Sequence, residues 1–355
     1  MKTTLQHIAA RAGVTKATVS YALSGKPSVS KEVRARILAI ASELGYQPHI
    51  TARSLSTGRA PTLGLMFESI ANPFYPEFAL EIERAARARG HFLLIGNTDS
   101  DPEVGRAFLD RIAGPLSAGV VAMAGSLHVE DVKRVAARGT PVVLCLWEDV
   151  GHPPGTPCVT VDFGRAAELA AGHVFALGHR RIGLLVAGGA NEMPHARRLE
   201  GFRKALGSVG VRPVAVEVAR RDTVKDGRDA ARRLLGTSVG VTAVCASNDL
   251  LALGVLQAAH ELRIRVPDEL SVTGITGISA TKLAWPSLTT VEVPVGEIAR
   301  TAIDMLVDLV EHRRPGEAPF EVVRSPPVLV ARESTAPLAF GRRNTPTRPG
   351  QREGK

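Results

Sequence analysis

From residue 61 onward, the chain alternates between short apolar runs and longer stretches in which apolar residues recur every three or four positions. The short runs predict β-strands buried on both faces, and the longer stretches predict amphipathic α-helices. Strands are predicted at 62–67, 92–96, 119–123, 142–146, 181–187, 214–218, 242–246, 270–275 and 288–293. Helices are predicted at 76–89, 103–112, 165–177, 195–209, 224–235 and 249–262. This alternation is typical of α/β folds with parallel sheets.

The alternating region is long for a single sheet and contains no short repeat. We therefore expect two doubly wound lobes, each a parallel sheet covered by helices on both faces. In folds of this kind, ligands bind outside the carboxyl ends of the strands, and clefts between lobes are favoured positions. The pattern thus predicts a ligand site between the two lobes.

The first sixty residues have a different pattern, which predicts three short helices. The first helix follows Thr4 and ends at Gly13, and its apolar positions form one face: Leu5, Ile8, Ala9 and Ala12. Thr15 and Ser30 are suited to cap a second helix at 16–23 and a third helix that ends at Gly45. A small residue where two helices cross, followed by a glycine turn, is the requirement of a helix-turn-helix. The few large apolar residues predict a thin core.

Charge is concentrated at the two ends of the chain. Residues 1–60 hold nine Lys and Arg against two Glu, a net charge of +7, and residues 336–355 have a net charge of +4. The residues between them have a net charge of −2. A basic module ahead of a nearly neutral body indicates contact with nucleic acid. A solvated basic surface or a three-helix protein-interaction domain are the alternatives, and the helix-turn-helix spacing favours DNA over both.

The exposed start of the second helix is the part that enters a major groove in a helix-turn-helix. Lys16 can donate to guanine or to a phosphate, Ala17 can contact a thymine methyl group, and Tyr21 offers a hydroxyl and a ring edge. Side chains or backbone amides suited to phosphate contacts lie at Thr4, Leu5, Thr15, Thr18 and Ser20.

Segments 4–20 (TLQHIAARAGVTKATVS), 44–48 (LGYQP) and 52–55 (ARSL) closely resemble the LacI/GalR family of bacterial repressors. The resemblance continues in the body, where the landmark segments are NPFY at 72–75, LGHRRIG at 177–183, RLEGF at 198–202, TAV at 242–244, ND at 248–249, VPDELSV at 266–272 and PSLTTV at 286–291. It covers almost the whole chain up to about residue 335. It implies an all-α headpiece followed by a two-lobed α/β domain like those of periplasmic binding proteins.

The same resemblance divides the chain into functional parts. It implies a helix-turn-helix domain at 1–48, a hinge helix at 49–60 and an effector-binding and dimerisation domain at 61–335. The N-lobe would comprise about 61–160 plus 292–325, and the C-lobe 161–291, so that the chain crosses between lobes three times. We expect the basic tail at 336–355 to be disordered and to make at most an accessory DNA contact.

By this resemblance Lys16, Ala17 and Tyr21 read bases, and the hinge folds on operator DNA. Leu55 would wedge into the minor groove, and Arg53 would lie beside it on the DNA. The chain departs from the family at Tyr21, where relatives often have Arg, and at His49, where they often have Asn. Operator preference therefore cannot be transferred from relatives. The implied partners are palindromic double-stranded DNA, a second copy of the chain in a dimer or tetramer, and a small-molecule effector, sugar-like or another metabolite.

Eight residues are candidate effector ligands: Asn72, Phe74, Tyr75, Trp147, Arg198, Asn248, Asp249 and Thr276. The resemblance makes Arg198 the anchor, since its fork suits carboxylates, phosphates or paired hydroxyls, and an exposed helix arginine is the alternative. Phe74 and Trp147 would stack on a ligand or simply pack in the core. Asp249 would bind ligand hydroxyls or cap the next helix.

One departure bears on the effector. Relatives usually carry an aspartate that binds sugar hydroxyls at the position occupied here by Thr276, and a hydroxyl is a weaker acceptor than a carboxylate. A simple monosaccharide is therefore less strongly indicated. Glu68 and Asp162 are the other carboxylates that could replace it. Whether the effector releases DNA or promotes its binding is left open.

Other classes of protein are poorly supported. No apolar run approaches the ~18 residues of a membrane span, the amino terminus has no secretory pattern, and three cysteines lack CxxC spacing. The GxSxG match at 236–240 follows a predicted helix and precedes a strand, the reverse of a nucleophile elbow around Ser238. Neither a phosphate loop nor an HExxH zinc helix is present. We expect a cytoplasmic protein, nucleoid-associated when bound to DNA, that is not an enzyme and needs no cofactor or metal.

Overall fold

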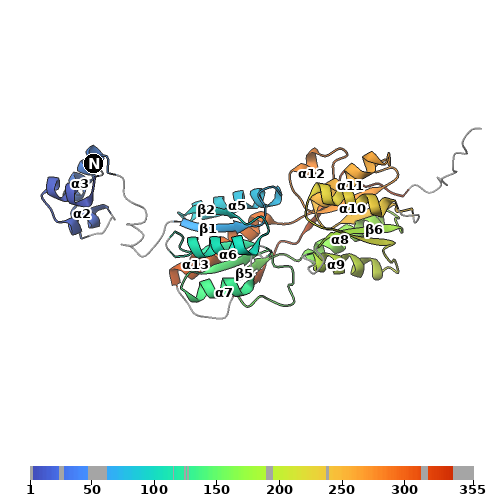
Figure 1. The fold of residues 1–355 in the computed structure, drawn as a ribbon, viewed down its shortest axis with the longest axis horizontal. Helices are drawn as coiled ribbons and strands as arrows, with labels where there is room; N and C mark the ends of the chain where they lie inside the picture. Colours follow the sequence, from blue (N-terminus) through green and yellow to red (C-terminus); the bar gives the residue numbers. More distant parts are fainter. Residues whose placement is uncertain are drawn as a thin grey trace, which may run out of the picture.

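The computed structural model describes residues 3–23, 28–46, 62–114, 116–123, 125, 128–188, 195–236, 240–312 and 319–338. They form an all-α headpiece, residues 3–46, and two α/β lobes (Figure 1). The implied hinge at 49–60, with Arg53 and Leu55, lies outside the described residues.

The headpiece contains helices α1 (Leu5–Ala12), α2 (Lys16–Leu23) and α3 (Lys31–Glu43), which confirms the three predicted helices. Gly13 ends α1 in the left-handed conformation, with φ of 65°. The caps are also as predicted: Thr15 Oγ1 accepts from the Thr18 N–H at 3.1 Å, and Ser30 Oγ accepts from the Val33 N–H at 3.3 Å. The buried core is small and consists of Ile8, Ala9, Ala12, Val19, Ala22, Val29, Ile37 and Ala41.

The N-lobe is a six-stranded parallel sheet in the order β11-β5-β4-β3-β1-β2. Its strands are β1 (Thr62–Phe67), β2 (Phe92–Asn97), β3 (Val120–Met123), β4 (Val142–Cys145), β5 (Cys158–Thr160) and β11 (Phe320–Val322). Its helices are α5 (Phe74–Ala88), α6 (Pro102–Ile112), α7 (Val129–Ala137) and α13 (Val295–His312).

The C-lobe repeats this plan in the order β12-β10-β9-β8-β6-β7, with only β12 antiparallel. Its strands are β6 (Ile182–Ala187), β7 (Ala215–Ala219), β8 (Ala243–Ala246), β9 (Ser271–Thr276), β10 (Thr289–Glu292) and β12 (Val328–Val330). Its helices are α8 (Phe163–Ala176), α9 (Ala196–Gly207), α10 (Val224–Leu235), α11 (Asp249–Glu261) and α12 (Ala280–Leu283).

Each predicted strand and helix of the body is present, within a few residues of its predicted ends. The elements that the pattern did not predict are α7, α12 and α13 and the three-residue strands β5, β11 and β12. The chain passes between the lobes after β5, after β10 and between β11 and β12. In both sheets the strand order reverses beside the first strand of the lobe, at β1 and at β6, and such reversals place ligand sites at the strands' carboxyl ends.

The beginning of the predicted disordered tail is ordered. Ala336 N–H donates to Ser271 Oγ at 3.1 Å, and Leu338 N–H donates to the Leu177 carbonyl at 2.8 Å. The tail prediction was therefore wrong for 336–338, because these backbone groups find partners on the C-lobe; residues 339–355 lie outside the described part. Over the described ranges, no helix combines the length and the apolar character needed to cross a membrane.

Candidate functional site

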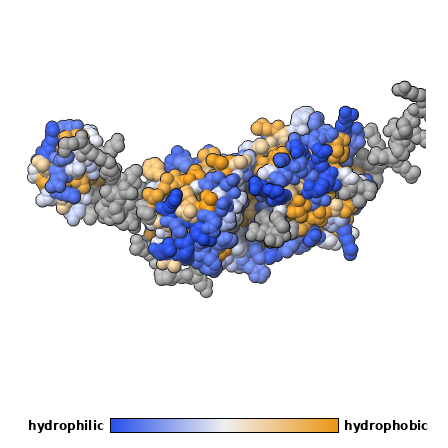
Figure 2. Space-filling view, in the orientation of Figure 1, coloured by the Kyte–Doolittle hydropathy of each residue, from blue (hydrophilic) through white to orange (hydrophobic). Residues whose placement is uncertain are grey.

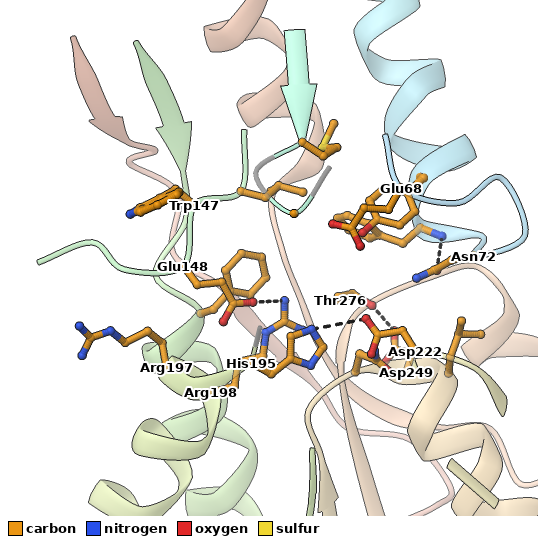
Figure 3. A pocket seen from close by; sticks show the side chains of 18 of the residues that line it. Glu68, Asn72, Trp147, Glu148, His195, Arg197, Arg198, Asp222, Asp249 and Thr276 are labelled. Atoms are coloured by element: carbon orange, nitrogen blue, oxygen red, sulfur yellow. Dashed lines mark hydrogen bonds and ion pairs between the residues drawn. The ribbon is translucent and has the colours of Figure 1, made fainter. Parts of the chain in front are cut away.

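A cavity of about 510 Å³ lies between the two lobes. Its polar residues follow the carboxyl ends of strands from both sheets: Glu68 after β1, Glu148 after β4, Asp222 after β7, Asn248 after β8 and Thr276 in β9 (Figure 3). All eight candidate effector residues line this cavity, and so does Glu68. Asp162 does not line it, because its carboxylate caps α8 by accepting from the Arg165 N–H at 2.8 Å.

Arg198 lies in the first turn of α9, and only 7% of its side chain is exposed. Its Nη2 is 2.7 Å from Glu148 Oε1, and its Nη1 donates to the Ser247 carbonyl at 2.7 Å. The guanidinium carbon lies 4.1 Å from the ring centroid of Phe163. One turn later, α9 approaches α8 so closely that a Cβ on Gly201 would be 2.2 Å from a backbone oxygen. This packing fixes α9 and with it the guanidinium.

The contact of Arg198 with Glu148 connects the C-lobe with the N-lobe. A second pair lies next to it, with Arg197 Nη2 2.6 Å from Asp149 Oδ2. Two consecutive arginines of α9 thus pair with two consecutive acids after β4. The second pair is more exposed, with about a third of each side chain accessible. We refer to these two ion pairs as the interlobe clasp.

Burial changes the protonation of the groups around Arg198. It raises the pKa of Glu148 to about 7, although the Arg198 charge acts against the rise. Burial also raises the pKa of Glu68 and of Asp222. Burial and the neighbouring Arg198 charge hold the pKa of His195 well below its usual value, so its ring is neutral at pH 7. Its Nδ1 lies 2.8 Å from Ser247 Oγ and its Nε2 lies 3.5 Å from Asp222 Oδ2.

The aromatic candidates of α5 pack in the hydrophobic core and also line the cavity. Phe74 and Tyr75 are buried at the start of α5, and the Tyr75 ring stacks on Phe67 with centroids 5.8 Å apart. The neighbouring Tyr75 hydroxyl lowers the pKa of Glu68 and so acts against the rise that burial causes. Asn72 Oδ1 accepts from the Phe74 N–H at 3.1 Å, which leaves its amide nitrogen available to the cavity.

Trp147 lies at the edge of the cavity (Figure 3), and its indole N–H donates to the carbonyls of Asp149 and His152, both at 3.0 Å. These bonds hold the ring in its own loop, and its other side packs against the N-lobe core. Trp147 therefore both lines the cavity and packs against the core.

The alternative of Asp249 as a helix cap is wrong, because Asn248 caps α11, with its Oδ1 accepting from the Leu251 N–H at 2.8 Å. The buried Asp249 carboxylate instead accepts from Thr276 Oγ1, from the Gly277 and Ile278 amides and from Thr290 Oγ1. Three of these bonds hold the end of β9 and the residues after it, and the fourth comes from β10; Thr276, the last residue of β9, has a φ of 119°. The Thr276 hydroxyl proton is used inside the protein, so this side chain faces the cavity only as an acceptor.

Several polar cavity residues were not among the sequence candidates, and the most buried of them are Glu148, Asp222 and His195. Glu148 and Asp222 each follow the end of a predicted strand, which is the position that the fold reserves for ligand contacts. His195 precedes Arg198 by one helical turn. Their positions in the sequence were the only signal that could have identified these residues. That signal is weak, because acidic residues are common after strands. Across the described ranges, no group of three or more potential metal-ligating side chains is present.

In the headpiece, the candidate base-reading residues lie together on α2. Lys16, Ala17 and Tyr21 are exposed, and 42% of Tyr21 is accessible. Thr15 Oγ1 and Thr18 Oγ1 lie 2.8 Å apart at the start of the helix. Leu5 is half-buried against the headpiece core, so only its backbone is well placed for a phosphate contact.

The chain is similar to known proteins over almost its whole length. The family model for bacterial regulatory proteins of the lacI family matches residues 4–49, and the model for the periplasmic binding protein-like domain matches residues 171–335. The HTH-type transcriptional regulator DegA of Bacillus subtilis is 30% identical, over 95% of this chain and 99% of the relative. The ribose operon repressor of Escherichia coli is 29% identical, over 86% of this chain and 92% of the relative.

Among solved structures, the lac repressor dimer bound to operator and the anti-inducer ONPF has the same fold. It matches with a TM-score of 0.82 at 24% identity, over 95% of this chain and all of that chain. The fold prediction of a helix-turn-helix headpiece joined to a two-lobed α/β body is thereby confirmed.

Proposed function

Since this chain belongs to the LacI family of bacterial regulatory proteins and is a DNA-binding transcriptional regulator, we propose that it is a repressor controlled through its interlobe cavity. It would bind a palindromic operator as a homodimer, and a small polar metabolite would change its affinity for that operator. The observation that carries this proposal is a polar cavity whose ligating groups come from both lobes, in a chain that begins with a basic helix-turn-helix.

The DNA-facing part of the proposal rests on α2. Lys16 and Ala17 begin this helix and Tyr21 follows one turn later, all exposed, in the position that a recognition helix presents to a major groove. The net charge of +7 in residues 1–60 would neutralise phosphates and make binding fall steeply with salt. Contacts from Arg53 and Leu55 of the hinge belong to the same proposal. Operator binding would place the protein on the nucleoid, in the cytoplasm.

Homodimerisation is supported by exposed apolar side chains along one edge of the body. On β2, the exposed fractions are 74% for Phe92, 39% for Leu94 and 52% for Ile95. At the end of α12, Leu283 and Trp285 are 86% and 90% exposed. Figure 2 shows hydrophobic colour along this edge, over β2 and α5 of one lobe and over α12 of the other. Burial of such surface against a second copy would bring two headpieces to two half-sites.

Control by an effector requires that the ligand bind one arrangement of the lobes more tightly than another. The lining of the cavity supports such a preference, because Glu68 and Glu148 come from the N-lobe and Arg198 and Asp222 from the C-lobe. A ligand that contacts both sets would favour closed lobes, and the N-lobe would pass the change on, since its β1 is the first strand after the headpiece. The effector would be a sugar-like or related metabolite.

Selection of bound DNA from the organism's genome tests the proposal. The full-length wild-type protein should enrich an inverted repeat, and a Lys16→Ala/Tyr21→Ala variant should enrich none while keeping its thermal unfolding temperature. The matched control is Lys133→Ala, an exposed lysine on α7 of the body, which should select the same repeat as the wild type. Enrichment of no motif by the wild type, or the same motif by the α2 variant, would overturn the proposal.

A further inference from the structure

The cavity walls carry far more negative than positive charge. Six of the described lining residues are acids and two are arginines. Both arginines form ion pairs: Arg198 with Glu148, and Arg197, which points away from the cavity in Figure 3, with Asp149 and Glu200. His195 is neutral, and Asp249 is satisfied within the C-lobe. Within the described residues, neither Glu68 nor Asp222 forms an ion pair with a lysine or arginine, although the Arg198 charge lowers the pKa of both.

The same residues present more acceptors than donors. Two buried acceptors of the cavity, Glu148 Oε2 and Asp222 Oδ1, have no hydrogen-bond partner in the described structure. One buried donor, Arg198 Nε, also has none. Buried polar atoms are normally paired, so a ligand that fills the cavity has to supply these partners. Such a ligand needs more donors than acceptors.

Glu68 and Asp222 face the cavity from opposite lobes (Figure 3). Burial raises the pKa of Glu68, and the charge of Asp222 raises it further, so the two carboxylates repel each other through the cavity. Two like charges on separate lobes oppose closure when nothing lies between them. A cation between them would remove the repulsion and attract both lobes, whereas a phosphate or carboxylate would be repelled.

We propose that the effector is a small polyol with a protonated amine, of the amino-sugar type, whose ammonium group lies between Glu68 and Asp222. This inference rests on the proposed function, because it assigns the controlling ligand to the interlobe cavity. The ammonium group donates to carboxylates of both lobes and joins them. Its hydroxyls donate to Glu148 Oε2 and accept from Arg198 Nε. The apolar part of the lining, which includes Phe74, Phe163 and Ile278, packs against the carbon face of the ring.

Matched ligands test this class directly. Binding to the full-length protein is measured by titration calorimetry at pH 7 for D-glucosamine, D-galactosamine and D-mannosamine, each beside the sugar that has a hydroxyl in place of the amine and beside that sugar's 6-phosphate. We expect at least one amine to bind tenfold or more tightly than its hydroxyl counterpart, and the phosphates to bind more weakly than either. The proposal is overturned if every amine binds no more tightly than its counterpart, or if a phosphate binds best.

Two variants show whether the proposed carboxylates cause the preference. Glu68→Gln and Asp222→Asn keep the shape of the side chains and remove the charge. Each should reduce the ratio of amine to hydroxyl affinity at least tenfold and change the affinity of the hydroxyl sugar less than threefold. Asp229→Asn, on α10 outside the cavity, is the control and should leave the ratio unchanged. An equal loss for both sugars in the cavity variants would contradict the proposal.

The ligand-free protein supplies a further measurement. Since Glu68 and Asp222 repel each other, Asp222→Asn should raise the unfolding temperature of the empty protein, and a lower temperature would count against the arrangement. The outcomes separate the two proposals. A protein that selects an inverted repeat but shows no amine preference refutes the amine inference alone. A protein that prefers amines but selects no DNA refutes the proposed function.

Discussion

In the headpiece, the residues proposed to read DNA lie within six positions on a single helix. The cavity instead combines Glu68, Asp222 and Thr276, which are spread over more than 200 residues of the chain. The two regions also differ in solvation. Lys16, Ala17 and Tyr21 are exposed, whereas most of the cavity residues are half-buried or buried. Substitutions at the exposed α2 residues should therefore leave the headpiece folded. Substitutions in the cavity should change both ligand binding and the free energy of unfolding, because the same buried groups serve both.

The largest effect is expected where this link is strongest, at the interlobe clasp. Arg198→Ala leaves the buried Glu148 without its partner and should lower the free energy of unfolding of the lobes by about 3–5 kcal/mol. Arg197→Ala breaks the more exposed pair with Asp149 and should cost less than about 1 kcal/mol. Urea denaturation followed by tryptophan fluorescence measures both, because the two tryptophans, Trp147 and Trp285, lie in the lobes. If both substitutions lower the free energy of unfolding equally, burial does not determine the contribution of these ion pairs.

The next effect concerns folding of the headpiece. Ile8 is fully buried in a core of few large side chains, so Ile8→Ala should cost about 2–4 kcal/mol. A domain this small has little stability to lose, so the headpiece should unfold and DNA binding should disappear. Far-UV circular dichroism and gel shift measure these losses, while tryptophan fluorescence should report unchanged lobes. Leu38→Ala, on the exposed face of α3, is the control and should change none of these signals by much.

A smaller effect is expected at the exposed surface of the same helix bundle. Lys16→Ala should weaken binding to the selected operator by about 1–3 kcal/mol, roughly tenfold to a hundredfold, because a donor to a base or phosphate is removed. Its unfolding temperature should stay that of the wild type, since Lys16 is exposed. Fluorescence anisotropy with labelled operator measures the change. If the unfolding temperature falls together with the affinity, the loss of binding comes from a less stable headpiece and the prediction is wrong.

The last effect is a dependence of stability on pH. The pKa of Glu148 is raised from 4.5 to about 7, so between these values the folded protein binds more protons than the unfolded chain. Stability therefore falls as pH rises through this window. The difference in unfolding free energy between wild type and Glu148→Gln should shift by roughly 2 kcal/mol against the wild type from pH 5 to pH 7. Glu130→Gln, exposed on α7, should show no such shift.

The comparison also explains which features the sequence could predict. The headpiece helices were predictable because glycine, threonine and serine signals lie within a few residues of the helix ends that they define, as at Gly13, Thr15 and Ser30. The longer strands and helices of the body followed from their periodicity. Strands of three residues, such as β5 and β11, are too short to show a period.

The cavity was predictable only in part. Its place at the strand ends followed from the fold class, and all eight candidate residues line it. Glu148 and Asp222 were missed because an acid after a strand has several uses. Asp162 also follows a strand, yet it caps α8. Which acids meet in the cavity depends on how two separate sheets are placed together, and no local pattern contains that information.

The three passages of the chain between the lobes have a consequence for synthesis. The edge strand β11 of the N-lobe is residues 320–322, and β12 of the C-lobe is residues 328–330, so neither sheet can be completed until the ribosome is close to the end of the body. The headpiece, which needs only the first 46 residues, can fold as soon as it emerges. A nascent chain can thus acquire its DNA-facing helices long before both walls of the interlobe chamber exist.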